Sequence, residues 1–85
     1  MYDKWLKGVY SRHNHIIMTN STIGNNIKLR RKFLKVTQTQ LADLSGLSIN
    51  TLYKIERGQA NPTIDTLIKI ADILGMKMTI DIIRK

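Results

Sequence analysis

Two stretches with helical spacing, separated by a glycine, lie between Thr37 and Gly58 and constrain the fold more than any other part of the chain. Thr37 can cap a first helix, and Gln40 three residues later completes a capping box. Gly46 supplies the left-handed backbone freedom that ends this helix, and Ser48 can cap the next one. The sequence therefore predicts two short helices joined by a tight turn, the second of them ending at Gly58.

The apolar residues of these two helices are spaced so that each helix has an inward face, formed by Leu41, Ala42 and Leu44 in the first and by Leu52 and Ile55 in the second. The outward residues of the second helix include no acidic side chain: they are Ile49, Asn50, Thr51, Tyr53, Lys54 and Arg57. In a helix-turn-helix, the second helix enters the major groove of DNA while the first lies across the backbone. We therefore expect this outward face to bind DNA.

The charge of the chain agrees with a polyanionic partner. Fourteen Lys+Arg residues against six Asp+Glu residues give a formal net charge of +8 and a pI near 10.1. Nucleic acid is the simplest such partner for a small domain, although an acidic protein or an anionic membrane is also compatible. Basic residues cluster just before the two helices, at Lys28, Arg30, Arg31, Lys32 and Lys35. Alone, such a cluster indicates a solvated helix face, but beside a DNA-reading pair of helices it favours nucleic acid.

Several classes of protein are disfavoured by the composition. The absence of cysteine excludes disulfides and thiolate metal sites, and His13 and His15 have no acidic ligand nearby, so we expect no metal and no cofactor. No apolar run approaches the roughly 20 residues of a membrane span, and no signal peptide is evident. We expect a cytoplasmic protein that is not an enzyme, because the single glutamate, Glu56, has no nucleophile or phosphate-binding glycine loop to act with.

The pattern of caps and apolar residues predicts the domain boundaries. Residues 1–20 are expected to form an N-terminal arm, which either touches phosphates or is a flexible tail, with Met18 a candidate start of the domain proper. Residues 21–75 are expected to form the DNA-binding domain. Its first helix would be capped by Ser21 or Thr22 and run to about Lys35, with an inner stripe formed by Ile23, Ile27, Arg31 and Leu34.

An arginine in this inner stripe needs a partner, because arginine is seldom buried unpaired. Glu56, near the end of the second DNA-facing helix, is the candidate. We predict that Arg31 and Glu56 form a partly buried, hydrogen-bonded ion pair that holds these helices together.

The segment after Gly58 predicts a further helix. Asn61-Pro62 is a turn signal, Thr63 can cap a helix that ends at Leu74, and Gly75 can close it. The loop before this helix crosses the sugar-phosphate backbone in folds of this kind. Gln59 and Asn61 are therefore candidate phosphate contacts, although both also fit ordinary turn chemistry.

Residues 76–85 change to the period of a strand, because Met76, Met78, Ile80 and Ile82 alternate with polar residues. A lone strand cannot satisfy its backbone groups, and no second strand candidate is present in the sequence. We predict that this strand pairs with its copy in a homodimer, which would present two recognition helices to a palindromic site. The alternative is an amphipathic tail packed on its own core.

Together these features are typical of one family. The sequence from Ile23 to Met76 resembles the Cro/CI-type (XRE-family) helix-turn-helix of phage repressors, through Arg31, the TQTQLA segment, Gly46, the IERG segment and the NPT turn. The resemblance implies an all-α fold, a compact bundle of four or five helices that binds double-stranded DNA as a dimer. The C-terminal strand would be added to that bundle.

The resemblance also implies roles for individual residues. Gln38, Thr51 and Arg57 would contact phosphates, and the residues facing the bases would be Ser48, Ile49, Asn50, Tyr53 and Lys54. The chemistry agrees, since asparagine can bind adenine, lysine can donate to guanine and isoleucine can pack on a thymine methyl. The family often has glutamine where Ile49 stands, so specificity here would depend more on apolar contact and DNA shape.

The C-terminal segment LGMKMTIDI is similar to that of the HipB-type antitoxins. This resemblance implies a protein that represses its own operon and neutralises a toxin, a HipA-like kinase. The alternative is a stand-alone phage-type repressor or a restriction-modification controller without a toxin partner.

Overall fold

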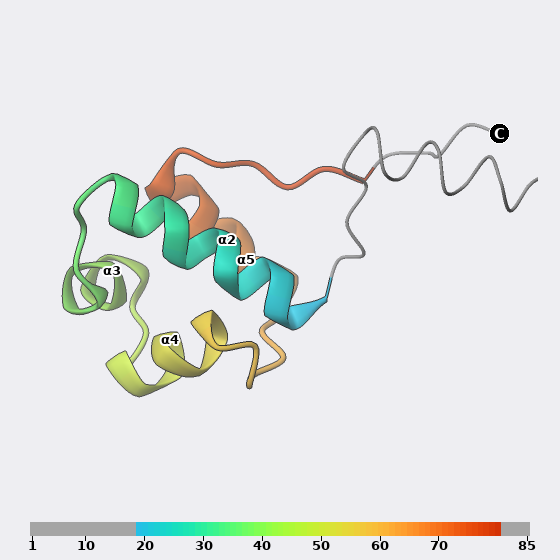
Figure 1. Ribbon diagram of the computed structural model, residues 1–85, viewed down its shortest axis with the longest axis horizontal. Helices are drawn as coiled ribbons and strands as arrows, with labels where there is room; N and C mark the ends of the chain where they lie inside the picture. The colour runs from blue at the N-terminus through green and yellow to red at the C-terminus, as the bar shows by residue number, and fades with distance from the viewer. Residues whose placement is uncertain (1–18, 81–85) are drawn as a thin grey trace, which may run out of the picture.

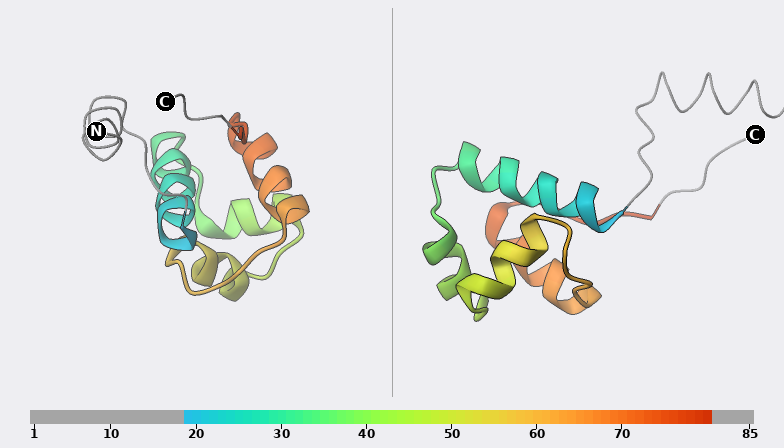
Figure 2. Two further views of the ribbon diagram at one scale, coloured as in Figure 1. Left: turned by 90° about the vertical axis from the view of Figure 1, so that its right-hand side faces the viewer. Right: turned by 60° about the horizontal axis from the view of Figure 1, so that its bottom comes forward.

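The computed structural model describes residues 19–80 of the chain, which form four helices (Figure 1). The helices are α2 (Asn20–Phe33), α3 (Gln38–Ser45), α4 (Ile49–Glu56) and α5 (Ile64–Leu74). Both α2 and α3 pack against α4 and α5. In the left view of Figure 2, α2 and α5 stand side by side, and α3 and α4 close the bundle beneath them. The prediction of an all-helical bundle is therefore confirmed for this part of the chain.

Each helix begins at a hydroxyl residue whose side chain accepts a hydrogen bond from the backbone N–H three residues later; the caps are Thr19, Thr37, Ser48 and Thr63. The capping box predicted between Thr37 and Gln40 is present in both directions, at 2.9 and 3.0 Å. The predicted cap of the first helix was wrong. Thr19 takes that place because Thr22 then stands at the position whose N–H the cap accepts, at 3.0 Å.

Each helix is followed within two residues by a residue in the left-handed conformation. Gly46 and Gly75 close α3 and α5 with φ values of 71° and 68°, as predicted. In α4, Glu56 is the last helical residue, and the left-handed Gly58 follows two residues later. The expectation that the first helix reaches Lys35 was wrong: α2 ends at Phe33 because Lys35 itself is left-handed, with φ of 59°.

The core is centred on Leu41, Leu52, Ile70 and Leu74, which are fully buried and come from α3, α4 and α5. Each such side chain contributes roughly 1.5–3 kcal/mol by leaving water. Leu34 and Leu44 were expected to face inward but are 39% and 62% exposed. Leu34 follows the last residue of α2, and in α3 the buried Ser45 takes the inner position next to Leu44, with its hydroxyl donating to the Leu41 carbonyl at 2.7 Å.

Gly24 sets the distance between α2 and α4. It is buried, and a Cβ atom at this position would lie only 2.1 Å from the Ile55 carbonyl oxygen and 2.8 Å from that of Glu56. Even an alanine would therefore push the two helices apart. This close approach places the C-terminal turn of α4 against α2, and so brings Glu56 within reach of Arg31.

The predicted C-terminal strand is not part of the described fold, because none of residues 19–80 lies in a strand and residues 76–80 follow α5 without regular structure. A strand is defined by hydrogen bonds to a neighbouring strand, and residues 19–80 offer none. The predicted N-terminal arm, with His13 and His15, and the predicted contact residue Ile82 lie outside the described residues. No helix in residues 19–80 is long and apolar enough to span a membrane.

Candidate nucleic-acid interface

The outer face of α4 is formed by the residues that the sequence analysis predicts to contact DNA. Ile49 and Tyr53 are 48% and 45% exposed, although both are large and hydrophobic. The polar members of the face, Ser48, Asn50, Thr51, Lys54 and Arg57, are exposed as well. The acidic residue of α4, Glu56, is buried and points inward. The structure therefore brings the predicted DNA-facing side chains together on one surface that carries no exposed carboxylate.

Contacts within this face limit which groups are free to bind. The Ser48 hydroxyl accepts from the Thr51 N–H at 3.0 Å and donates to the Thr51 hydroxyl oxygen at 2.9 Å. The Ser48 proton is thus occupied by the Thr51 hydroxyl, and its oxygen by the helix cap. The Arg57 guanidinium lies over the Tyr53 ring, 5.3 Å from its centre, which orders two long side chains at the C-terminal end of α4.

The ion pair predicted between Arg31 and Glu56 is present and connects α2 to α4. Arg31 Nε donates to Glu56 Oε2 at 2.7 Å and Nη2 donates to Oε1 at 2.9 Å, while Nη1 donates to the Val36 carbonyl at 3.0 Å. Both residues are buried, at 7% and 5% exposure. This two-point geometry fixes the rotation of α4 about its axis as well as its distance from α2.

Gln38, predicted to contact phosphate, also takes part in this network. It is half-buried, and its Nε2 donates to Glu56 Oε1 at 3.0 Å. An amide nitrogen has two N–H groups, so one of them remains for an external acceptor. The capping box occupies the backbone N–H groups of Thr37 and Gln40, and those of Gln38 and Thr39 have no partner among the described residues. The start of α3 therefore keeps donors for an anion.

The other predicted phosphate contacts, Gln59 and Asn61, lie in the connection between α4 and α5 and are exposed. The Gln59 N–H donates to the Lys54 carbonyl at 2.8 Å, and its exposed side chain has no hydrogen-bond partner among residues 19–80. They stand beyond the C-terminal end of α4, at the opposite end of that helix from Ser48.

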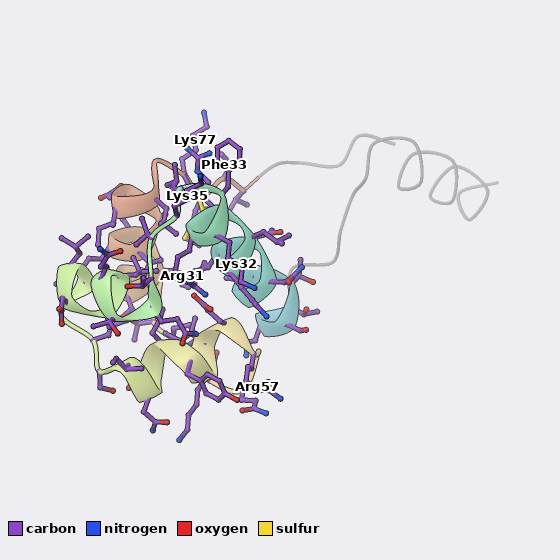
Figure 3. The ribbon with its side chains drawn as sticks, turned by 60° about the vertical axis from the view of Figure 1, so that its left-hand side comes forward. Arg31, Lys32, Phe33, Lys35, Arg57 and Lys77 are labelled. Carbon is purple, nitrogen blue, oxygen red and sulfur yellow. The ribbon has the colours of Figure 1, made fainter. Side chains whose placement is uncertain are left out.

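The basic cluster that the sequence shows as one group is divided by the fold. Arg31 is buried in its ion pair, and Arg30 donates from Nε to the Leu74 carbonyl at 2.9 Å while lying over Phe33. Lys32 and Lys35 line a shallow hollow at the start of α3. Figure 3 shows Phe33 and Lys35 at the end of the molecule where α2 ends, and Arg57 at the opposite end. Sequence periodicity did not separate these roles, because they depend on which helix packs beside each side chain.

Comparison with known proteins identifies relatives of this chain. A helix-turn-helix family model, HTH_3, matches residues 27–80. The immunity repressor protein of Bacillus phage phi105 is 43% identical over 58 residues, which cover 68% of this chain and 40% of the repressor. The chain thus spans about two fifths of the length of that relative.

Two solved structures share the fold. A complex of a HipB variant with the O2 20mer has a TM-score of 0.69 and 29% sequence identity, covering 81% of this chain and 96% of that one. The restriction-modification controller protein C.AhdI from Aeromonas hydrophila has a TM-score of 0.65 and 29% identity, covering 68% of this chain and 88% of that one.

Replacing Arg31 tests the structural role of the ion pair. Arg31→Met should lower the free energy of unfolding by about 3–5 kcal/mol, because Glu56 is left buried and unpaired. The double variant Arg31→Met/Glu56→Leu should regain most of that loss, since neither charge is then buried alone. Urea denaturation measures the free energy of unfolding of both variants, with Arg57→Met, a substitution at an exposed position, as the control. A single variant as stable as the wild type would contradict this role.

Proposed function

The chain belongs to the HTH_3 (XRE-type) helix-turn-helix family, and we propose that it is a sequence-specific repressor of transcription that inserts α4 into the DNA major groove. The observation that carries the proposal is the face of α4. Its exposed residues offer amide, hydroxyl, ammonium, guanidinium and apolar groups and no carboxylate, while Glu56 is turned inward and neutralised by Arg31. Such a face suits base edges flanked by phosphates.

Base recognition would come from the N-terminal and middle turns of α4. Asn50 can form two hydrogen bonds with an adenine, Lys54 can donate to a guanine, and Ile49 can pack against a thymine methyl. Tyr53, held beside Arg57, would contribute a rigid ring at the groove wall. Because the Ser48 proton is donated to the Thr51 hydroxyl, the Ser48 hydroxyl would contact a base through its oxygen or through water.

Phosphate contacts would hold the helix in this position from its C-terminal end. Gln38 donates to Glu56 at that end, so the N–H groups at the start of α3 lie beside it, and Gln59 and Asn61 follow it in the chain. Thr51 and Arg57 flank the base-reading residues. These contacts carry no sequence information but fix the register of α4 on the duplex.

Asn50→Ala should reduce affinity for the preferred duplex by about 1–3 kcal/mol and relax selection at one base position, because its two hydrogen bonds to a base are lost. The preferred duplex can be selected from a random pool, and affinity measured by fluorescence anisotropy. Gln38→Ala is the matched control: it should weaken selected and random duplexes by similar factors. If the two variants behave alike on random duplex, the division into base and phosphate contacts is wrong.

We propose further that the repressor acts as a homodimer joined through residues 76–85. Met78 and Ile80 are 45% and 99% exposed in the single chain, and the alternation that includes Met76 and Ile82 would give the segment one apolar side once it pairs with its copy. Two copies of α4 would then read a palindromic site, as dimeric helix-turn-helix proteins do.

Removal of residues 77–85 should give a folded monomer with much weaker binding to a palindromic duplex, as measured by light scattering and anisotropy. Ile80→Lys should also dissociate the dimer, because it places a charge on the apolar side of the paired strands. Lys77→Ala, on the other side of the alternation, should not. An unchanged dimer mass after the truncation would refute strand pairing.

More specifically, we propose that this repressor is an antitoxin, which represses its own operon and neutralises a HipA-like kinase. The likeness to HipB over most of both chains supports it. The likeness to a phage immunity repressor and to a restriction-modification controller supports the alternative, a repressor without a toxin partner. Purification of the tagged chain from its native cell should recover a kinase-like protein in fixed stoichiometry, identified by mass spectrometry. Recovery of the chain alone would favour the alternative.

A further inference from the structure

One side of α5 carries exposed apolar and acidic side chains together. Ile64 and Ile68 are 64% and 44% exposed, although both are large and hydrophobic. Asp65 and Asp72 are exposed as well. Residues three, four or seven positions apart lie on the same side of a helix, so these four side chains form one surface, which we call the α5 stripe.

Within residues 19–80, no other side chain neutralises this stripe. Neither Asp65 nor Asp72 has a side-chain hydrogen bond or an ion pair with another described residue. Lys69, the cation of α5, extends toward α3, where its Nζ would lie 3.5 Å from a Cβ atom at Gly46. The α5 stripe is therefore an unpartnered surface that fits an apolar partner with positive charge.

The charge of the α5 stripe disfavours two other partners. Its carboxylates would repel phosphates, so the stripe does not suit DNA. A second copy of the chain docked on it across a two-fold axis would bring the same carboxylates together, because both halves of such an interface are identical. The chemistry of the stripe thus favours an occupant that differs from it in charge.

A segment with matching chemistry precedes the described residues. Residues 1–12 combine three basic side chains with one acidic side chain, at Lys4, Lys7, Arg12 and Asp3. The same segment has apolar side chains that include Trp5, Leu6, Val9 and Tyr10. It is therefore basic and apolar where the α5 stripe is acidic and apolar.

The length of chain before α2 permits a contact with α5. A Cβ atom at Gly58 would lie 2.6 Å from the Ser21 Cα atom, so the connection after α4 touches the start of α2. In the left view of Figure 2, this connection passes the start of α2 before it reaches α5. Ile64 follows Gly58 by six residues, which places it within roughly 25 Å of Ser21. Residues 11–18 can span roughly 26 Å when extended, so residues 1–10 can reach the stripe.

We propose that the α5 stripe is the docking site of the chain's own N-terminal segment, residues 1–10. The apolar side chains of the segment would cover Ile64 and Ile68, and Lys4 and Lys7 would lie beside the two carboxylates. The segment is then neither a phosphate-binding arm nor a free tail. This contact is independent of the proposed function, because the α5 stripe is not part of the outer face of α4.

The exposed apolar side chains of α2 suit this segment less. Leu29 and Phe33 are 57% and 74% exposed, but the Arg30 guanidinium lies over the Phe33 ring, 5.4 Å from its centre. Lys32 is exposed beside them on the same helix. A basic segment would be repelled by these cations, whereas the α5 stripe attracts it.

The fluorescence of Trp5 tests the docking directly, because it is the only tryptophan of the chain. In the folded chain without DNA, its emission should lie at shorter wavelength than in the urea-unfolded chain, and acrylamide should quench it less, since the indole ring is shielded from water. Asp65→Lys/Asp72→Lys should shift the emission to that of the unfolded chain and restore quenching, because the stripe then repels Lys4 and Lys7.

Asp43→Lys is the matched control, because it reverses an exposed carboxylate on α3, outside the α5 stripe. It should leave the emission wavelength and the quenching unchanged. Circular dichroism checks that each variant keeps its helices, as expected for substitutions at exposed positions.

A charge swap separates docking from a general loss of structure. Lys4→Glu/Lys7→Glu should expose Trp5 in the otherwise unchanged chain. Combined with Asp65→Lys/Asp72→Lys, the same change should recover most of the shift to shorter wavelength, because opposite charges face each other again.

Three results would overturn the proposal. Emission like that of the unfolded chain in the wild type, or a shielded Trp5 that does not respond to Asp65→Lys/Asp72→Lys, would refute docking on α5. A shift that appears only as the protein concentration rises would refute a contact within one chain and would indicate docking on a second copy. Because the assay contains no DNA, its failure leaves the proposed function untouched, and a failure to bind DNA leaves this contact untouched.

Discussion

The buried pair of Arg31 and Glu56 is the interaction on which the geometry of this domain depends. It joins the first described helix to the recognition helix, and the same carboxylate receives the side chain of Gln38 from α3. Arg31 also donates to the Val36 carbonyl and so holds the turn between α2 and α3. A buried charge pair is not in itself a large source of stability, because desolvation opposes the attraction. Its directional hydrogen bonds give the domain one defined arrangement of three helices.

This arrangement has a direct consequence for electrostatics. Glu56 is the one acidic residue of α4, and on the outer surface it would repel phosphates. Pairing with Arg31 removes its charge from the interface, and Gly24 allows α2 to approach closely enough for the pair to form. The outer face of α4 is then left with neutral and cationic groups. Packing in the core and charge on the surface are thus set by the same contacts.

The network also places the start of α3 beside the end of α4. Gln38 donates one N–H of its side-chain amide to Glu56, and it lines the same shallow hollow as Lys32 and Lys35. The side chain proposed to contact a phosphate is therefore hydrogen-bonded to the helix proposed to read the bases. Small domains of this kind have few buried residues, so a single polar network can determine the position of most of the interface.

The sequence by itself determined the local features: Thr37 with Gln40, Ser48 and Thr63 as helix starts, Gly46 and Gly75 as helix ends, and the outward face of α4. These follow from short-range hydrogen bonding and from the helical period, which neighbouring residues encode. It also suggested the Arg31–Glu56 pair, because a single glutamate left few partners for an inward arginine. The tertiary structure alone decided which residues of the basic cluster are buried, paired or free, since Arg30, Arg31 and Lys32 are adjacent in sequence but face different neighbours. It alone decided that Leu44 is exposed, because the face of α3 that packs against α4 and α5 is formed by Leu41, Ala42 and Ser45. It also decided that Lys35, in the turn between α2 and α3, is left-handed. The strand expected after α5 needs a partner to supply its hydrogen bonds, and within one chain neither the sequence nor the fold of residues 19–80 provides it.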